Sequence, residues 1–372
     1  MLGARPLLGV AVTAVALCTG GLAYRSGRPS PPVVKPTLVT APVAHDPDDP
    51  AIWIDAAEPS RSLVIGTDKD ADGALFAFDL SGRVVKTVPR LKRPNNVDVE
   101  YGLMLGGRAV DIAVVTERLG DTIRVFSVPA LQPIDGGGIP VFVGETRRAP
   151  MGIALYKRPS DGAIFAIVGR KTGPTRGYLW QYRLEDDGAG RVRAVKVRAF
   201  GAWSGKGEIE AIAVDDAAGS VYYSDEWIGI REYRADPDEA DADGEVALFG
   251  TDGFAGDREG ISIYARDDGT GYILVSDQQA DRFQVFAREH TRGPPHDHPR
   301  LAVVNVSAHE SDGSEVASAP LGSAFPAGLF VAMSTDRSFQ LYSWPEIAAY
   351  IPPHVVAIRQ AGAYPPGTFQ TR

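Results

Sequence analysis

The sequence of 372 residues has very little cysteine, and its one thiol lies near the N-terminus, at Cys18. Without a second cysteine the chain can form neither an intramolecular disulfide nor a sulfur-rich metal site. It also lacks an excess of positive charge, because 38 Lys and Arg stand against 47 Asp and Glu. Nucleic-acid-binding proteins normally carry a basic face that releases phosphate counterions, so the composition argues against nucleic acid as a partner.

Long apolar runs are missing except at the start of the chain. Nineteen uncharged residues lie between Arg5 and Arg25, and a positive start followed by an apolar run is typical of a secretory signal. We therefore predict a signal peptide or N-terminal anchor over residues 1–29 and a secreted or periplasmic protein. The length also permits an uncleaved membrane anchor, although its Gly and Thr content makes a weak span. Removal of residues 1–29 leaves 35 basic and 47 acidic residues, a formal charge of −12.

The sequence contains six copies of one two-part motif. An apolar run ends in a small or hydroxyl residue followed by charge, and about ten residues later an alternating strand closes on an aromatic. The small or hydroxyl residues are Thr67, Thr116, Gly169, Ser224, Ser276 and Ser334. Their spacings are 49, 53, 55, 52 and 58 residues. A period near 50 with paired strands is typical of propeller blades, so the sequence predicts an all-β, six-bladed β-propeller with four-stranded antiparallel blades around a central channel.

The repeats also set the predicted domain organisation. Residues 45–352 form the propeller, residues 30–44 form a linker with a possible blade-closing strand, and residues 353–372 form a C-terminal tail. A strand from residues 30–44 would pair with the last blade and remove its exposed edge. No feature indicates oligomerisation, so a monomer is expected, with membrane contact only if the leader is retained.

Polar residues lie just before the apolar runs, in phase with the repeat. The innermost strand of a propeller blade lines the channel, so this phase places six residues near a common axis: Asp49, Asn96, Met151, Glu210, Glu259 and Asp312. Turn chemistry explains any one of them alone, but five oxygen-bearing residues in phase favour a binding site. Carboxylate and amide oxygens without Cys or paired His suit calcium rather than zinc. Converging carboxylates need such a cation or bound protons between them.

Basic residues recur just beyond the small or hydroxyl residues, as Lys69, Arg118, and Arg170 with Lys171. Each alone is ordinary surface charge. Beside an acidic ring they provide the ammonium and guanidinium groups that phosphate oxygens require. The two sets together predict a phosphate site with metal ions at its base.

At this point the motifs resemble those of a known family. They are DDPAIW at Asp48–Trp53, TDK ending at Lys69, NNVD at Asn95–Asp98 and DREG at Asp257–Gly260. In this order they resemble the β-propeller phytases, the calcium-dependent alkaline phytase family of 3-phytase type, from about His45 to Tyr350. The resemblance implies a phytase, a phosphoric monoester hydrolase with several calcium ions, and phytate (myo-inositol hexakisphosphate) as substrate.

The resemblance also implies roles for individual residues. The implied metal ligands are Asp48, Asp49, Glu210, Glu226, Asp257, Glu259 and Asp312. The implied phosphate-binding residues are Lys69, Arg118, Asn95 and either Arg170 or Lys171. No RHG-type phosphate-loop histidine is present, so no covalent nucleophile is visible. The hypothesis is therefore that calcium held by Glu210, Asp257, Glu259 and Asp312, together with Asp49, activates a water that attacks phosphorus in line.

Two positions depart from the family pattern. Met151 stands where members often have a tyrosine, and Ala308 stands where many have a second acidic residue of the last blade. Glu310 or Glu315 could compensate for Ala308.

Two other functions are compatible with a propeller, because the fold does not fix the activity. One is a calcium-dependent lactonase, which needs channel metals but not the basic cluster. The other is a non-catalytic, calcium-stabilised binding propeller. Elsewhere, the histidines of His296–His298 could bind a metal, but a solvated loop between blades is the expectation. The tryptophans are mostly expected as packing between blades, with Trp227, next to Glu226, a candidate to flank the site.

Overall fold

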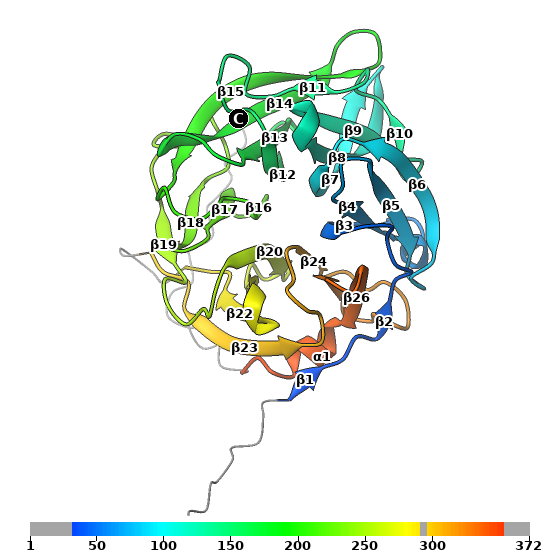
Figure 1. The fold of residues 1–372 in the computed structure, drawn as a ribbon, viewed down its shortest axis with the longest axis vertical. Helices are drawn as coiled ribbons and strands as arrows, with labels where there is room; N and C mark the ends of the chain where they lie inside the picture. Colours follow the sequence, from blue (N-terminus) through cyan, green and yellow to red (C-terminus); the bar gives the residue numbers. More distant parts are fainter. Residues whose placement is uncertain (1–31, 291–295, 353–372) are drawn as a thin grey trace, which may run out of the picture. The chain divides into compact units, whose positions relative to one another are not determined.

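Six β-sheets surround a central axis, and each is built mainly from strands that follow one another in the chain (Figure 1). The computed structural model describes residues 32–290 and 296–352; the predicted leader and the predicted C-terminal tail lie outside these residues. The predicted six-bladed propeller is therefore confirmed. Within the described ranges, no helix is long and apolar enough to cross a membrane.

The first three blades run from the innermost strand outwards in chain order. Blade one contains β3 (Pro47–Trp53), β4 (Leu63–Asp68), β5 (Gly73–Asp79) and β6 (Val84–Leu91). Blade two contains β7 (Pro94–Leu105), β8 (Arg108–Glu117), β9 (Thr122–Val128), β10 (Gln132–Pro133) and β11 (Ile139–Pro140), the last two both pairing with β9. Blade three contains β12 (Pro150–Lys157), β13 (Ile164–Arg170), β14 (Arg176–Asp186) and β15 (Val192–Ala202).

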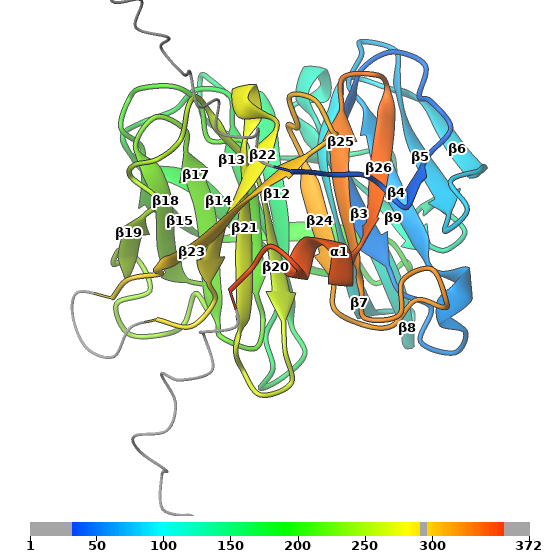
Figure 2. The ribbon, with the colours of Figure 1, turned by 90° about the horizontal axis from the view of Figure 1, so that it is seen from below.

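The last three blades follow the same order. Blade four contains β16 (Ile212–Asp215), β17 (Ser220–Asp225), β18 (Gly229–Arg234) and β19 (Ala247–Phe249). Blade five contains β20 (Arg258–Ala265), β21 (Gly271–Asp277), β22 (Arg282–Ala287) and β23 (Arg300–Val306). Blade six contains β24 (Ser314–Ala317), β25 (Leu329–Ser334) and β26 (Ser338–Ser343). The short helices are η1 (Pro59–Arg61), η2 (Arg118–Gly120), η3 (Gln278–Ala280) and α1 (Trp344–Ala348), which follows β26 (Figure 2).

The N-terminal segment completes the last two sheets. β2 (Leu38–Val39) pairs antiparallel with β26 and supplies the fourth strand of blade six, with Leu38 opposite Leu341. β1 (Val33–Val34) pairs parallel with β23 as a fifth strand of blade five. The two ends of the described chain therefore meet in one sheet (Figure 1), and the outer edge of β26 is paired rather than open.

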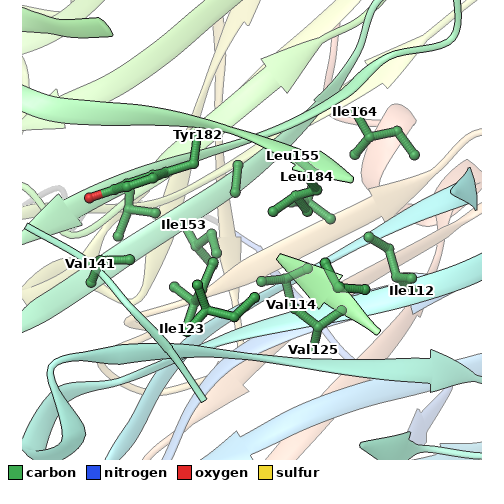
Figure 3. Packing of buried hydrophobic residues seen from close by; sticks show 14 of the residues in the cluster. Ile112, Val114, Ile123, Val125, Val141, Ile153, Leu155, Ile164, Tyr182 and Leu184 are labelled. Carbon is green, nitrogen blue, oxygen red and sulfur yellow. The ribbon is translucent and has the colours of Figure 1, made fainter. Parts of the chain in front are cut away.

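Apolar cores lie between neighbouring blades. Every residue of β4, β13, β21 and β25 is buried, which explains why these second strands are continuous apolar runs instead of alternating ones. Each blade interface has its own cluster; the one between blades two and three includes Ile112, Val114, Ile123, Val125, Ile153, Leu155 and Ile164 (Figure 3). Fully burying one such aliphatic side chain contributes about 1.5–3 kcal/mol.

Buried hydroxyls at the ends of the second strands connect successive blades. The Thr116 hydroxyl donates to the backbone carbonyl of Met151 in blade three at 2.6 Å. The Ser224 hydroxyl donates to the carbonyl of Arg258 in blade five, and the Ser276 hydroxyl donates to the carbonyl of Ser311 before blade six at 2.7 Å. Three of the five hydroxyl residues that mark the sequence repeat therefore hold the chain at the start of the next blade in place, whereas Thr67 and Ser334 bond within their own blades.

We predict that Thr116→Val destabilises the propeller without changing its shape, because valine preserves the volume but leaves the Met151 carbonyl without its partner. Such an unpaired buried acceptor costs about 1–3 kcal/mol. The measurement is thermal unfolding followed by circular dichroism. Thr87→Val, at an exposed position of β6, is the matched control. Equal melting temperatures for the two variants would show that the bridge contributes nothing.

Candidate functional site

The innermost strands lie closest to the axis (Figure 1). Asn95 and most of the sequence-predicted carboxylates lie at or just before the starts of these strands. The other predicted site residues lie at or just after the ends of the second strands: Lys69, Arg118, Arg170, Lys171 and Glu226. In blade one Pro47 pairs with Asp68 but Pro50 pairs with Gly66, so β3 has one residue more than β4 over this stretch. Blades two, three and five show the same shift at the start of β7, β12 and β20. Such a β-bulge bends the strand and re-aims its side chains. The extra residue falls at Asp48–Asp49 in blade one.

A short unit at the end of the second strand orients the loop before the innermost strand in four blades. There the hydroxyl residue that marks the repeat is followed by an acid, and that carboxylate accepts a backbone N–H group from the loop. Asp68 Oδ1 accepts from His45 and Asp46 at 3.0 and 2.7 Å, and Asp277 Oδ1 accepts from Ala255 at 2.8 Å. The residue after the acid then donates its own N–H to a carbonyl of the same loop, as Lys69, Arg118, Glu226 and Gln278 do. In blade three Lys171 makes the same hydrogen bond, although Arg170 stands in the place of the acid.

Lys69 links the first and last blades. Its Nζ pairs with Asp48 Oδ1 and lies 3.1 Å from Asp312 Oδ2. Gln278 donates to the other oxygen of Asp312. Burial lowers the pKa of Lys69, but Asp48 and Asp312 outweigh it and raise the pKa above its usual value. The ammonium group is therefore protonated and is held by two carboxylates.

Asn95 and Arg118 bring blade two into the same cluster. The Asn95 amide donates to Asp48 Oδ2 at 2.9 Å and to Glu210 Oε1 at 2.5 Å. Its Oδ1 is buried and has no hydrogen-bond partner among the described residues. Burial lowers the pKa of Arg118, while Glu210 and Asp48 raise it. The guanidinium thus faces the same carboxylates that Asn95 contacts.

Blades four and five contribute most of the carboxylates. Glu208, Glu210 and Glu226 each present an oxygen within 4.8 Å of the other two, and Glu226 also accepts the backbone N–H of Glu208 at 2.7 Å. Glu259 is buried, and its Oε2 has no partner among the described residues. Asp257 accepts hydrogen bonds from Trp227 Nε1 at 2.7 Å and from Gln279 Nε2 at 2.9 Å. Trp227 therefore flanks the cluster.

The crowding of these carboxylates changes their protonation. Burial and the charge of Asp48 raise the pKa of Glu210 to about 8 and that of Asp312 to about 7. Burial and the charge of Glu208 raise the pKa of Glu226 to about 7. Burial together with Glu210 raises the pKa of Glu259 well above its usual range. At neutral pH the group can ionise fully only if positive charge is added to it.

The structure separates the two basic candidates of blade three. Arg170 is 1% exposed; its Nη1 lies 3.2 Å from Glu145 Oε2, and its guanidinium lies over the Phe142 ring at 4.6 Å. In the β12–β13 register Arg170 occupies the place that Asp68 has in blade one. Its role is therefore to stabilise blade three itself. Lys171 is 42% exposed and pairs with Glu208 of the acidic cluster. The structure therefore brings Lys171, and not Arg170, to the other site residues.

Comparison with known proteins identifies the family. A sequence model of the phytase family matches residues 10–349. The chain belongs to the phytase family. The predicted resemblance is thereby confirmed, and the protein is an enzyme of this family. A curated relative, the 3-phytase of Bacillus subtilis (strain 168), is 28% identical over 341 residues, which cover 84% of this chain and 85% of the relative.

Solved structures resemble the phytase-family chain more distantly. Hydrazine synthase of Kuenenia stuttgartiensis aligns with a TM-score of 0.46 and 11% identity, covering 79% of this chain and 83% of that one. BBS1N, solved in complex with ARL6DN and soaked with lead, aligns with a TM-score of 0.48 and 10% identity, covering 84% and 80%. At this level of similarity neither structure bears on the site of this phytase-family protein.

The two departures from the family pattern have different surroundings. Met151 is fully buried, and its Sδ lies 3.0 Å from Arg118 Nη2; a thioether accepts only weakly, so it holds Arg118 less firmly than a hydroxyl would. Ala308 is buried in the apolar cluster between blades five and six, and its N–H donates to the Tyr342 hydroxyl. An acid at this position would lack a polar environment unless the loop differed.

Neither of the two proposed substitutes for an acid at Ala308 joins the Asp312 carboxylate. Glu310 is exposed. Glu315 lies deeper in the channel, where it lines a cavity of about 110 Å³ with Asp49, Asn96 and Asp98. Burial and the charge of Asp98 raise the pKa of Glu315 to about 8. The channel thus has a second acidic level below the first, and Asp49 belongs to it.

Two residues of the cluster were missed from the sequence. Glu208 pairs with Lys171 and belongs to the glutamate triad, and Gln278 fixes Asp312. The sequence contained a signal for Gln278 and for the choice of Lys171. Counting two positions on from Thr67, Thr116, Gly169, Ser224 and Ser276 reaches Lys69, Arg118, Lys171, Glu226 and Gln278.

We predict that removing charge at the two basic positions of blade three changes stability by very different amounts. Arg170→Met should destabilise the protein by about 2 kcal/mol or more, because buried carbonyls and Glu145 lose their donor. Lys171→Met is the matched variant, and its exposed side chain should change stability by less than about 0.5 kcal/mol. Urea unfolding at saturating calcium measures both. Equal losses would contradict the internal role of Arg170.

We also predict that the calcium-free protein loses stability as pH rises. The folded-state pKa values of Glu210 and Asp312, about 8 and about 7, exceed their ordinary values of 4.5 and 3.8. The folded state therefore binds more protons than the unfolded state between these values, and the free energy of unfolding falls as pH rises through this window. Urea unfolding in chelator between pH 5 and pH 8 should show a loss of at least about 1.4 kcal/mol, the equivalent of one pKa unit.

Glu210→Gln is the control for this pH dependence, because it keeps the volume but removes one titrating group. Its stability should fall less steeply over the same pH range. A wild-type stability that is flat or rises with pH in chelator would contradict the predicted crowding of charge.

Proposed function

We propose that the protein is a calcium-dependent phosphomonoester hydrolase that releases phosphate from phytate by direct attack of water on phosphorus. The observation that carries this proposal is the position of Lys69, Arg118 and Lys171. They occupy equivalent places in three successive blades, and each contacts or faces a carboxylate of one cluster. That cluster, called here the phytase site, comprises Asp48, Glu208, Glu210, Glu226, Asp257, Glu259 and Asp312.

The donor atoms of the phytase site fit a hard cation. All of them are carboxylate oxygens, and the neighbouring Asn95 adds an amide oxygen; calcium prefers such oxygen ligands in flexible geometries. The buried Oδ1 of Asn95 and Oε2 of Glu259 have no hydrogen-bond partner among the described residues, as expected of atoms that ligate an ion. When bound there, calcium would supply the positive charge that lets the carboxylates ionise together and would lower the pKa of a coordinated water.

The charges explain why phosphate binding should depend on calcium. Seven carboxylates face three basic side chains, so the site alone repels an anion. Lys69 is already shared between Asp48 and Asp312, and Lys171 is paired with Glu208. Once cations neutralise the carboxylates, these ammonium groups can donate hydrogen bonds to phosphate oxygens instead. A substrate with adjacent phosphates can place one beside Lys69 and Arg118 and a neighbour beside the exposed Lys171.

Each basic residue has a definite task in this reaction. Arg118 offers donors in a fixed fork, which matches two oxygens of one phosphoryl group. Lys69 sits at the base of the site as a point charge and stabilises negative charge that develops on the equatorial oxygens. Asn95 keeps Asp48 and Glu210 in position through its two hydrogen bonds. These roles require a water nucleophile, for which the oriented carboxylates provide hydrogen-bond acceptors.

The deciding experiment measures phosphate release from phytate at neutral to mildly alkaline pH, with calcium and then with chelator. We expect release with calcium and loss of release in chelator. Lys69→Ala/Arg118→Ala should lower kcat/KM by at least about 100-fold, or about 2.7 kcal/mol, while calcium still raises its melting temperature. Lys86→Ala/Arg108→Ala, at two exposed positions, removes the same charge and should leave turnover unchanged.

Other outcomes would separate this proposal from its alternatives. Calcium-dependent stabilisation without phosphate release from phytate would overturn the proposed reaction and favour a lactonase or a binding propeller. Normal turnover of the double variant would show that the basic residues do not bind substrate.

A further inference from the structure

A second group of metal-binding side chains lies between blades four and five, away from the phytase site. It comprises Glu232 of β18, His290 after β22 and His298 before β23. In the β17–β18 register Glu232 lies opposite Tyr222, towards the end where Ser220 pairs with Arg234. The phytase site uses the other end of the same strand pair, where Glu226 follows β17. The two groups therefore belong to opposite ends of blade four.

The three side chains converge closely. Their ligand atoms all lie within 4.8 Å of one another. His290 Nε2 is 2.8 Å from Glu232 Oε1, and His298 Nε2 is 3.2 Å from Glu232 Oε2. The Ser220 hydroxyl donates to Glu232 Oε1 at 2.7 Å, which fixes the carboxylate. Glu232 and His298 are buried, and His290 is half-buried.

The prediction of a solvated loop at residues 296–298 is wrong for His298. His296 and Asp297 are exposed, but His298 is fully buried, and its ring packs on Phe249 with centroids 4.5 Å apart. The physical reason is the contact with Glu232, which lies 66 residues earlier in the chain and is not visible from local sequence.

The hydrogen bonds of His298 define which of its nitrogens is free. Its Nδ1 lies 2.7 Å from the backbone carbonyl of Ala287, which can only accept, so Nδ1 carries a proton and donates. In the neutral imidazole Nε2 then presents a lone pair towards the Glu232 carboxylate, which is also an acceptor. A proton or a cation must lie between them. A metal-bound histidine has this arrangement, with its second nitrogen donating to a backbone carbonyl.

The group opens into a cavity. Glu232, His290, His296 and Tyr222 line a space of about 700 Å³ at this end of blades four and five. The Tyr222 hydroxyl is buried close to Ser220, whose hydroxyl donates to Glu232. A cation held by the three side chains would therefore keep a coordination position open to water or to a small ligand, with the Tyr222 hydroxyl near it.

We propose that Glu232, His290 and His298 form a binding site for a zinc-class divalent transition-metal ion, with an open coordination position facing the cavity. Two imidazoles and one carboxylate are the three protein ligands of many zinc sites that keep their fourth position free. Calcium, which prefers oxygen ligands, is disfavoured here. The protein then selects different ions at its two sites, by oxygen ligands in the channel and by imidazole nitrogens between the blades.

The test uses the full chain without a purification tag, saturated with calcium so that the phytase site is occupied. Zn²⁺ binding is measured by calorimetry in phosphate-free buffer, and Co²⁺ binding by its visible absorption. We expect one ion, bound with a Kd below about 10 μM, or about −7 kcal/mol. His290→Ala and Glu232→Gln should each weaken binding at least 10-fold and abolish the absorption bands.

His309→Ala is the matched control, because His309 Nδ1 also pairs with a carboxylate, Asp281, at 2.9 Å, but without a second imidazole. It should bind Zn²⁺ like the wild type. Circular dichroism and calcium-dependent melting establish that each variant is folded; His290 is half-buried, so its truncation is tolerated more easily than that of His298. Absence of Zn²⁺ binding, or equal binding by wild type, His290→Ala and Glu232→Gln, would overturn the proposal and leave the three residues as a protonated His–Glu ion pair.

Discussion

The β-bulge at the start of the innermost strand sets where the side chains of the phytase site lie. A regular strand would send Asp48 and Asp49 to opposite faces, and only one of them could face the channel. With one extra residue in β3, Asp48 joins Lys69 and Asn95 while Asp49 lies one level deeper with Glu315 and Asp98. The bulge alone would be free to flex. Hydroxyl bridges between blades and the acids that hold the preceding loops fix it in position.

Rigid placement matters because the site gathers charges that repel one another. Burial and mutual repulsion push Glu210, Glu226 and Asp312 towards protonation, and a flexible loop would relieve this by moving them apart. The sheets do not allow that movement, since their second strands are buried on both faces. This repulsion favours the binding of cations. If the ion is calcium, as proposed above, the stability of the fold depends on calcium supply.

Much of the fold and part of the site could be predicted from the sequence. The repeat of about 50 residues fixed the number of blades, because each copy contains the same buried second strand. Position in the repeat also gave the angle of each acidic residue around the axis, but it could not give its depth. Asp49 and Asn96 line the deeper cavity rather than the phytase site. Arg170 could not be assigned from its type, because the neighbouring lysine has the same charge and only the strand register shows which of the two is internal. The contact between Glu232 and His298 joins segments 66 residues apart that share no motif, so no local sequence pattern predicts it.

The closure of the ring ties together parts of the chain that are made at different times. Leu38 of β2 pairs with Leu341 of β26, and the Phe339 N–H donates to the Thr40 hydroxyl across 299 residues of sequence. A ribosome that adds about 5–20 residues per second therefore releases the first half of this sheet long before the second half exists. Until then β2 has no partner strand. The pairing of β2 with β26 closes a loop of almost the whole chain. This closure slows folding, because the conformational entropy of the loop is lost before the strands gain their contacts. A chain built in this way can complete its last sheet only after synthesis has passed β26.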